Sequence, residues 1–219
     1  MMSWRRWRWP VAYFVDLQNA AMLSADMAWE TRHMGGYGVE EYVRDIRAIV
    51  AVESDHAVIT DRIKPLALRL ASDPGWFKEK YRHTDPEQGV GLHLLHEEEN
   101  HDLAVFAIAW APGKGVSAHN HKTWAVVSGI EGQEHETNYK RLDDGSVPGF
   151  ADLVATRQET LYPGTTVCCH PEDIHAVVNN GTSVAVSLHT YGRHLNHTGR
   201  STFDVEAKSE TPLILKIEH

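Results

Sequence analysis

The chain has few cysteines, and their placement limits what they can do. Cys168 and Cys169 are the only two among 219 residues, and they are adjacent. An adjacent pair does not make the disulfide framework of a small secreted protein. We therefore interpret both as small buried strand residues and expect a cytoplasmic, reducing environment.

Positive charge and long apolar runs are also scarce. The chain carries 21 Lys and Arg against 30 Asp and Glu, for a formal net charge of -9. No basic stripe is visible, so a general nucleic-acid partner is not expected. The apolar run Val11 to Val15 ends at Asp16, well short of a membrane span, so no membrane partner is expected either.

The first ten residues form a basic segment rich in tryptophan. This segment loosely resembles a signal peptide, but the apolar run that follows is short for one. Because exposed tryptophans are unusual unless covered, we expect a packed arm that is suited to a subunit contact. The sequence leaves monomer and homodimer open.

Residues 36–80 have helical patterning. Apolar residues recur from Val39 to Val50 with a period close to 3.6, which predicts one helix. A second helix is expected from about Thr60 to Leu70, with Pro65 delaying its start or kinking it. Asp73-Pro74-Gly75 should end it.

From about residue 90, short runs rich in β-branched and aromatic residues alternate with turn signals. The expected strands are Gly91–His96, Ala104–Trp110, Thr123–Ile130, Glu134–Tyr139, Val154–Tyr162, Thr165–Cys169, Ala176–Asn179 and Val184–Tyr191. Such a series without βαβ alternation predicts a sandwich or barrel, and Asn180-Gly181 is a strong hairpin signal. We expect one domain, with an N-terminal arm and helices over 1–85 and a β-barrel over 86–219.

Histidines supply the strongest chemical signal. His119 and His121 are one residue apart, and alternate residues of a strand face the same side. Neutral imidazole suits zinc, copper, iron and nickel. His175 is the preferred third ligand, with His170 as the alternative. The remaining histidines, except one on the polar row described next, show no spacing that demands a metal; they are His33, His56, His83, His93, His96, His101, His135, His194, His197 and His219.

A polar row accompanies this candidate metal site. Ser187, His189 and Tyr191 alternate along one expected strand and therefore share a face. The row is either part of the reaction site or a set of structural hydrogen bonds only.

Together these motifs resemble those of the cupin superfamily, small β-barrels that hold a metal. Gly113-x5-His119-x-His121 is similar to the first cupin motif and His175-x3-Asn179 to the second. The glutamate usual in the first motif is absent, since Ala125 and Val126 stand there. The three-histidine branch resembles the thiol dioxygenases, whose Ser-His-Tyr row matches the row above. The likeness is to the bacterial cysteine dioxygenase-like group, which includes 3-mercaptopropionate dioxygenases.

This resemblance implies a mainly β fold, a single jelly-roll-like cupin barrel with N-terminal α-helices. It implies an Fe(2+) cofactor held by His119, His121 and His175, although the sequence alone also permits nickel, manganese or zinc. The implied reaction uses a small thiol and O₂ as partners and yields a sulfinate. Tyr191 would donate a hydrogen bond to bound oxygen or substrate, and His189 and Ser187 would orient it.

The resemblance also bears on substrate recognition. An Arg nine residues after the Tyr is typical of the mercaptopropionate-type enzymes, and Arg200 stands there. Its guanidinium matches a carboxylate, with Arg193 as a closer alternative. Cysteine-using relatives carry an Arg on the first strand, but this chain has Gly91-Leu92-His93 and no Gln there either. His93 could act as a polar substrate contact, so the substrate is 3-mercaptopropionate-like or cysteine-like.

Three further expectations complete the sequence interpretation. The segment Trp124 to Val126 has no Cys, so no Cys–Tyr crosslink is expected. A cupin enzyme of another metal and substrate class, such as a carbon-cleaving dioxygenase or an isomerase, remains an alternative. So does a non-catalytic ligand-binding cupin. The missing glutamate and the Ser-His-Tyr row argue against a cupin enzyme of another class. The open metal face argues against a non-catalytic cupin.

Overall fold

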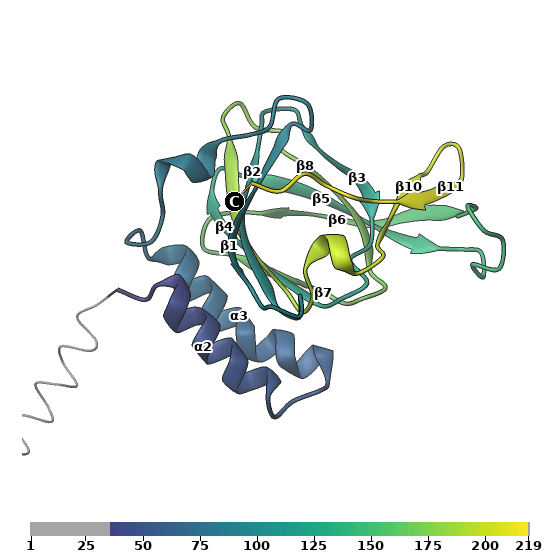
Figure 1. Cartoon of the computed structure of the whole chain (residues 1–219). Coiled ribbons are helices and arrows are strands. Elements are labelled where there is room, and N and C mark those ends of the chain that lie inside the picture. Colours follow the sequence, from purple (N-terminus) through teal and green to yellow (C-terminus); the bar gives the residue numbers. More distant parts are fainter. Residues whose placement is uncertain (1–35, 219) are drawn as a thin grey trace, which may run out of the picture. The chain divides into compact units, whose positions relative to one another are not determined.

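A computed structural model of the chain describes residues 36–218 (Figure 1). The expected N-terminal arm lies outside this range. The helical elements are α2 (Val39–Val50), α3 (His56–Ser72), η1 (Glu79–Arg82) and η2 (Leu195–His197). The strands are β1 (Val90–Glu97), β2 (Ala104–Trp110), β3 (Gly115–His119), β4 (Ala125–Glu131), β5 (Glu134–Arg141), β6 (Leu153–Leu161), β7 (Thr166–Cys169), β8 (Ile174–Val178), β9 (Ala185–Tyr191), β10 (Ser201–Asp204) and β11 (Ser209–Pro212).

The strands form two antiparallel sheets. One has five strands in the order β1-β2-β9-β4-β7, and the other has six in the order β11-β10-β3-β8-β5-β6. The chain passes from one sheet to the other after β2, β3, β4, β6, β7, β8 and β9, as in a jelly roll. The predicted mainly β, jelly-roll-like fold with N-terminal helices is therefore confirmed. The division at residue 86 remains a prediction.

The two helices cover the outer face of the five-stranded sheet. Tyr42, Ile46 and Ile63 are fully buried in one apolar cluster with Val126 and Leu188 of that sheet. Figure 1 shows the helix pair beside this sheet. The sheet is thus buried on both faces, which explains why every residue of β2 is buried and its sequence is a continuous apolar run.

Helix α3 begins earlier than predicted and continues through its proline. Asp55 caps it, because its Oδ1 accepts a hydrogen bond from the backbone N–H of Ala57 at 2.8 Å. That cap moves the start from Thr60 to His56. Pro65 costs one helical hydrogen bond, yet the buried residues Ile63 and Ala67 on either side keep the helix intact. The predicted end at Asp73 is confirmed.

The hairpin predicted at Asn180-Gly181 is wrong. β8 belongs to the six-stranded sheet and β9 to the five-stranded one, so the turn carries the chain between sheets. The buried Asn179 shapes this crossing. Its side-chain amide donates to the carbonyl oxygens of Trp110 and Ser183, both at 2.8 Å, and its oxygen accepts from Gly181 N–H at 2.9 Å.

Strands β10 and β11 were not predicted. They are short, four residues each, and rich in Ser and Thr. Their sequence shows little of the apolar alternation by which a half-buried strand is recognised. They pair with each other, and β10 adds them to the edge of β3.

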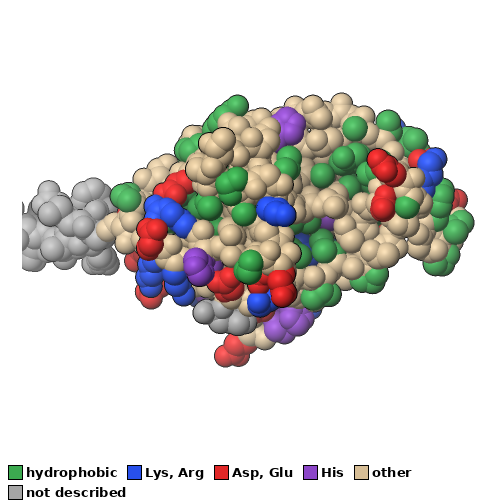
Figure 2. Space-filling view, turned by 90° about the horizontal axis from the view of Figure 1, so that it is seen from above, with side chains coloured by type: hydrophobic (Ala, Val, Ile, Leu, Met, Phe, Trp, Pro, Cys, Tyr) green, Lys and Arg blue, Asp and Glu red, His purple; other side chains and the backbone are tan. Residues whose placement is uncertain are grey.

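The described surface has no basic stripe on the face that Figure 2 shows. On the face shown in Figure 2, acidic and basic side chains are interspersed rather than separated into patches of one sign. Within residues 36–218, no helix is long and apolar enough to cross a membrane.

The Asn179 network yields a first prediction. Asn179→Ala should lower the free energy of unfolding by about 2 kcal/mol, because it leaves the buried carbonyl of Trp110 without its donor. Urea unfolding followed by circular dichroism measures this. Asn180→Ala, at the exposed neighbouring position, is the matched control and should change stability by less than about 0.5 kcal/mol. Equal effects of the two substitutions would contradict the assigned role.

Candidate metal centre

Three histidines converge between the two sheets. His119 ends β3, His175 lies beside it on β8, and His121 follows in the segment that leads to β4. All three are buried, and one ring nitrogen from each lies within 4.8 Å of the others. The Nε2 atoms of His121 and His175 are 3.2 Å apart. The structure therefore brings together the three residues predicted as metal ligands.

A bulge in β3 aims His119 inward. Val116 pairs with Val177 and His119 with His175, so β3 uses three residues where β8 uses two. Both Val116 and His119 line the same cavity. Regular alternation from Val116 would have turned Ala118 inward instead, so the bulge re-aims the histidine. His121 lies just beyond the strand, and the His-X-His geometry is not that of a regular strand.

Neighbouring groups orient two of the rings. Nδ1 of His119 donates to the carbonyl oxygen of Ser117 at 2.9 Å, which leaves its Nε2 as the free ligand atom. Glu136 Oε1 lies 3.1 Å from Nδ1 of His175, although this contact is not aligned as a hydrogen bond. The carboxylate favours a proton on that nitrogen and a lone pair on Nε2.

Burial keeps two of these imidazoles neutral. It lowers the pKa of His119 and of His121 well below the usual histidine value, and the neighbouring His175 adds to the effect. Neutral imidazole is the form that binds a metal.

Asn120, between two of the histidines, anchors a distant segment. Its Oδ1 accepts a hydrogen bond from Ser201 N–H at 2.9 Å, and its own N–H donates to Ser201 O at 3.2 Å. This double contact fixes the residue next to Arg200. The spacing of the histidines does not reveal this role of Asn120, because a side chain that is not a ligand leaves no pattern in the ligand spacing.

The polar row lies on the inner face of β9, opposite the histidines. Ser187 Oγ is 2.7 Å from His189 Nε2, and His189 Nδ1 is 2.8 Å from Tyr191 Oη. All three side chains are buried. Burial lowers the pKa of His189 to about 3, so this ring is neutral and carries one proton.

Trp110 sets the direction of this row. Its indole N–H can only donate, and it donates to Ser187 Oγ at 3.1 Å. The Ser187 hydroxyl can then donate to His189 Nε2, and in that arrangement the histidine proton is on Nδ1. His189 Nδ1 then donates to the oxygen of Tyr191, and the Tyr191 O–H can donate into the cavity. Burial raises the pKa of Tyr191, so the phenol keeps this proton.

Arg200 enters the same cavity. The residue is 3% exposed, and its buried Nε and Nη2 atoms have no hydrogen-bond partner among residues 36–218. Burial lowers the pKa of Arg200 to about 10, but the group still carries its charge near neutral pH. A buried guanidinium without a counter-ion is costly, so this arrangement calls for an anionic ligand.

The cavity between these groups is small. Arg200, Tyr191 and the three histidines line it together with Leu92, Trp110 and other apolar side chains. About 20 Å³ of space is free inside. This space has room only for a small molecule, and side chains must shift to admit one.

Other sequence candidates lie elsewhere. His93 is buried on the opposite side of β1, where its Nε2 contacts His83 O at 2.9 Å and its Nδ1 contacts Glu218 at 3.3 Å. His93 is not among the residues that line the cavity, because strand alternation turns Leu92 inward and His93 outward.

The two alternatives left open by the sequence also lie outside the cavity. Arg193 forms an ion pair with Asp102 at 2.7 Å. His170 is exposed on the turn before β8.

Both cysteines are free thiols on β7. Cys169 is buried and Cys168 is half-buried, and burial raises the pKa of each thiol.

The family comparison agrees with this geometry. A family model described as cysteine dioxygenase type I matches residues 39–201, which is more than half of the chain. The chain belongs to the cysteine dioxygenase type I family. The resemblance to the cupin thiol dioxygenases is therefore confirmed, and membership of this family supports a cysteine dioxygenase-like thiol dioxygenase in the broad sense.

Solved structures give weaker likenesses. A protein with a double-stranded β-helix domain from Klebsiella pneumoniae subsp. pneumoniae MGH 78578 is 15% identical, with a TM-score of 0.42 over 58% of this chain and 90% of that chain. A recombinant oxalate oxidase in complex with glycolate is 16% identical, with a TM-score of 0.41 over 57% and 62% of the two chains. A protein from Thermus thermophilus is 18% identical, with a TM-score of 0.39 over 54% and 97%.

The histidines of this cysteine dioxygenase family member suit a metal ion. Nδ1 of His119 is already engaged by a carbonyl, and Nε2 of His121 and of His175 face each other. Three imidazole nitrogens would hold an ion and leave room in its coordination for other ligands. The donor set therefore fits a divalent transition metal.

The choice of third ligand can be tested directly. His175→Ala should remove metal binding, because it deletes one of three converging nitrogens. His170→Ala should leave it unchanged, since that side chain is exposed on the turn. Metal content per chain after reconstitution measures both. Full metal in His175→Ala together with loss in His170→Ala would reverse the assignment.

Proposed function

We propose that the protein is an iron(II)-dependent thiol dioxygenase that oxidises a small mercapto-carboxylate, 3-mercaptopropionate- or cysteine-like, to its sulfinate. The reaction is R–SH + O₂ → R–SO₂H, in which sulfur loses four electrons, dioxygen gains them, and both oxygen atoms end on sulfur. The observation that carries the proposal is a buried guanidinium whose Nε and Nη2 have no partner in the described part of the chain, in the same cavity as three converging histidines.

The three-histidine donor set supports this choice of chemistry. His119, His121 and His175 would hold Fe²⁺ without adding negative charge, and the ion would supply affinity for a thiolate and for dioxygen. Arg200 supplies a second positive group in the same cavity. A ligand with a thiolate at one end and a carboxylate at the other would satisfy both groups.

The residues of the chain then have separate tasks. Arg200 holds the carboxylate through charge-assisted hydrogen bonds and so fixes the position of the sulfur. Tyr191 donates its O–H into the cavity, towards oxygen or substrate. His189 holds the Tyr191 oxygen at 2.8 Å, and Ser187 and Trp110 fix the proton of His189 on Nδ1. The apolar lining, including Leu92, keeps bulk water out.

The remaining parts of the proposal follow from this reaction. The partners are a small thiol and O₂, and a cytoplasmic location fits the two free cysteines. A non-catalytic ligand-binding protein would have no need of a tyrosine hydroxyl oriented by three successive hydrogen bonds.

The proposal is tested by oxygen uptake. Fe²⁺-loaded protein is mixed with 3-mercaptopropionate, cysteine, mercaptosuccinate or cysteamine, and sulfinate is measured. We expect one sulfinate for each O₂ consumed with a carboxylate thiol, and no uptake by His175→Ala. If iron is bound and no thiol supports uptake, the thiol dioxygenase function is wrong and a cupin enzyme of another class takes its place.

A substitution at the end of the polar row tests its role. Tyr191→Phe should retain iron and the fold but lower kcat about 100-fold, because it deletes a hydrogen-bond donor aimed at the reacting groups. Steady-state oxygen uptake and iron content provide the two measurements. An unchanged kcat would reduce the row to structural hydrogen bonds.

Carboxylate recognition has its own test. Arg200→Met should raise KM for 3-mercaptopropionate by about 10- to 100-fold, as expected for a lost charge-assisted hydrogen-bond pair. The KM for cysteamine, which has no carboxylate, should not rise. Arg193→Met is the matched control, because Arg193 binds Asp102 outside the cavity. A parallel rise of KM for both thiols in Arg200→Met would show that Arg200 does not read the carboxylate.

A further inference from the structure

A second group of potential metal ligands lies outside the cavity. Glu97 is at the end of β1, His101 is in the turn that leads to β2, and His197 is in η2. One ligand atom from each lies within 4.8 Å of the others, although the segments are about a hundred residues apart in the chain. The sequence spacing gave no reason to connect them.

The donor atoms of this group are already oriented. His101 Nδ1 is 2.5 Å from Glu97 Oε1, and the His101 and His197 rings are stacked with centroids 3.6 Å apart and planes within 9°. An ion can take the place of the proton between these two atoms, so that Nδ1 of His101 and Oε1 of Glu97 both become ligands.

His194 completes the surroundings of Glu97. It is buried, and its Nδ1 accepts a hydrogen bond from Asn196 N–H at 3.3 Å. Its remaining proton is therefore on Nε2, which lies 4.0 Å from Glu97 Oε1. The carboxylate thus faces two imidazoles, and a third ring stacks on one of them.

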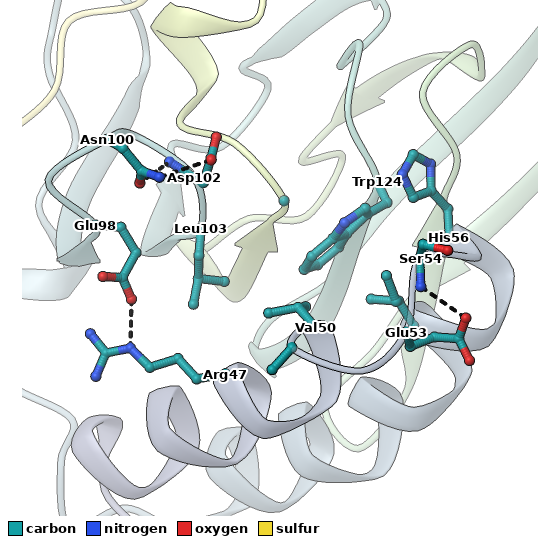
Figure 3. Close-up of a pocket in the computed structure, with 13 residues that line it drawn as sticks. Arg47, Val50, Glu53, Ser54, His56, Glu98, Asn100, Asp102, Leu103 and Trp124 are labelled. Atoms are coloured by element: carbon teal, nitrogen blue, oxygen red, sulfur yellow. Dashed lines mark hydrogen bonds and ion pairs between the residues drawn. The ribbon is translucent and has the colours of Figure 1, made fainter.

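Other contacts hold the two segments in place. Arg47 of α2 binds Glu98 in the β1–β2 turn at 2.6 Å. Within the same turn, Asn100 binds Asp102 at 2.9 Å (Figure 3). Asp102 also pairs with Arg193, and the backbone N–H of the next residue, His194, donates to His101 O at 2.8 Å. The ligand groups are therefore positioned by contacts that do not involve the ligand atoms, which is what a preformed site requires.

We propose that Glu97, His101 and His197 form a second site for a divalent transition-metal ion, of which zinc is the best match. Two imidazoles and one carboxylate are a common zinc ligand set, whereas calcium and magnesium prefer oxygen ligands alone. The ion joins the β1–β2 turn to the segment between β9 and β10. That segment leads to Arg200, so the ion stabilises the path to the guanidinium without entering the cavity. The inference does not depend on the thiol dioxygenase reaction.

Zinc titration of the metal-free full chain by isothermal calorimetry tests the site. We expect one equivalent of zinc that persists in His119→Ala, where the three-histidine centre is lost, and disappears in His197→Ala. Glu97→Gln preserves the side-chain shape and should weaken this equivalent at least about tenfold. His96→Ala is the matched control, since His96 is a nearby histidine outside the cluster.

Thermal unfolding provides an independent measurement in the same proteins. Zinc should raise the Tm of His119→Ala and should not raise that of the double variant His119→Ala, His197→Ala, because an ion that binds only the folded state stabilises it. The proposal is overturned if no zinc equivalent survives in His119→Ala, or if the surviving equivalent is unaffected by both His197→Ala and Glu97→Gln.

Discussion

The pairing of β3 with β8 is the constraint on which the site depends. The extra residue in β3 places His119 directly beside His175, and the chain then leaves the strand with His121 facing the same space. Asn120, between the two histidines, binds Ser201 and thereby fixes the position of the neighbouring Arg200. One local irregularity in one strand thus sets the geometry of the metal ligands and of the group opposite them.

The five-stranded sheet buries polar side chains on its inner face. Its outer face is apolar and covered by α2 and α3, while its inner face carries Ser187, His189 and Tyr191. Buried polar groups are costly unless each is hydrogen-bonded. The chain of hydrogen bonds that begins at Trp110 meets this requirement, and it leaves one donor, the Tyr191 hydroxyl, for the cavity.

The charge in the cavity is left unbalanced by the protein itself. Burial keeps His119 and His121 neutral, and Arg200 brings a positive charge. Nε and Nη2 of Arg200 have no partner among the residues that the structure describes. The buried positive charge of Arg200 lowers the stability of the folded protein, and the same charge makes the cavity suitable for a small anion. Burial of a functional group at a cost to stability is typical of a binding site that its ligand completes.

Local sequence was sufficient to predict the fold class, most strands, the three converging histidines and the polar row, because hydrophobic period and ligand spacing are local properties. It could not predict the crossing at Asn179, where a turn that favours a hairpin instead joins two sheets. Nor could it predict which way the His93 side chain points, because only the packing of the two sheets decides which face of β1 lines the cavity. The bulge, the contact of Asn120 with Ser201, and the meeting of Glu97 with His197 arise from the packing of distant segments, and no local pattern in the chain encodes them.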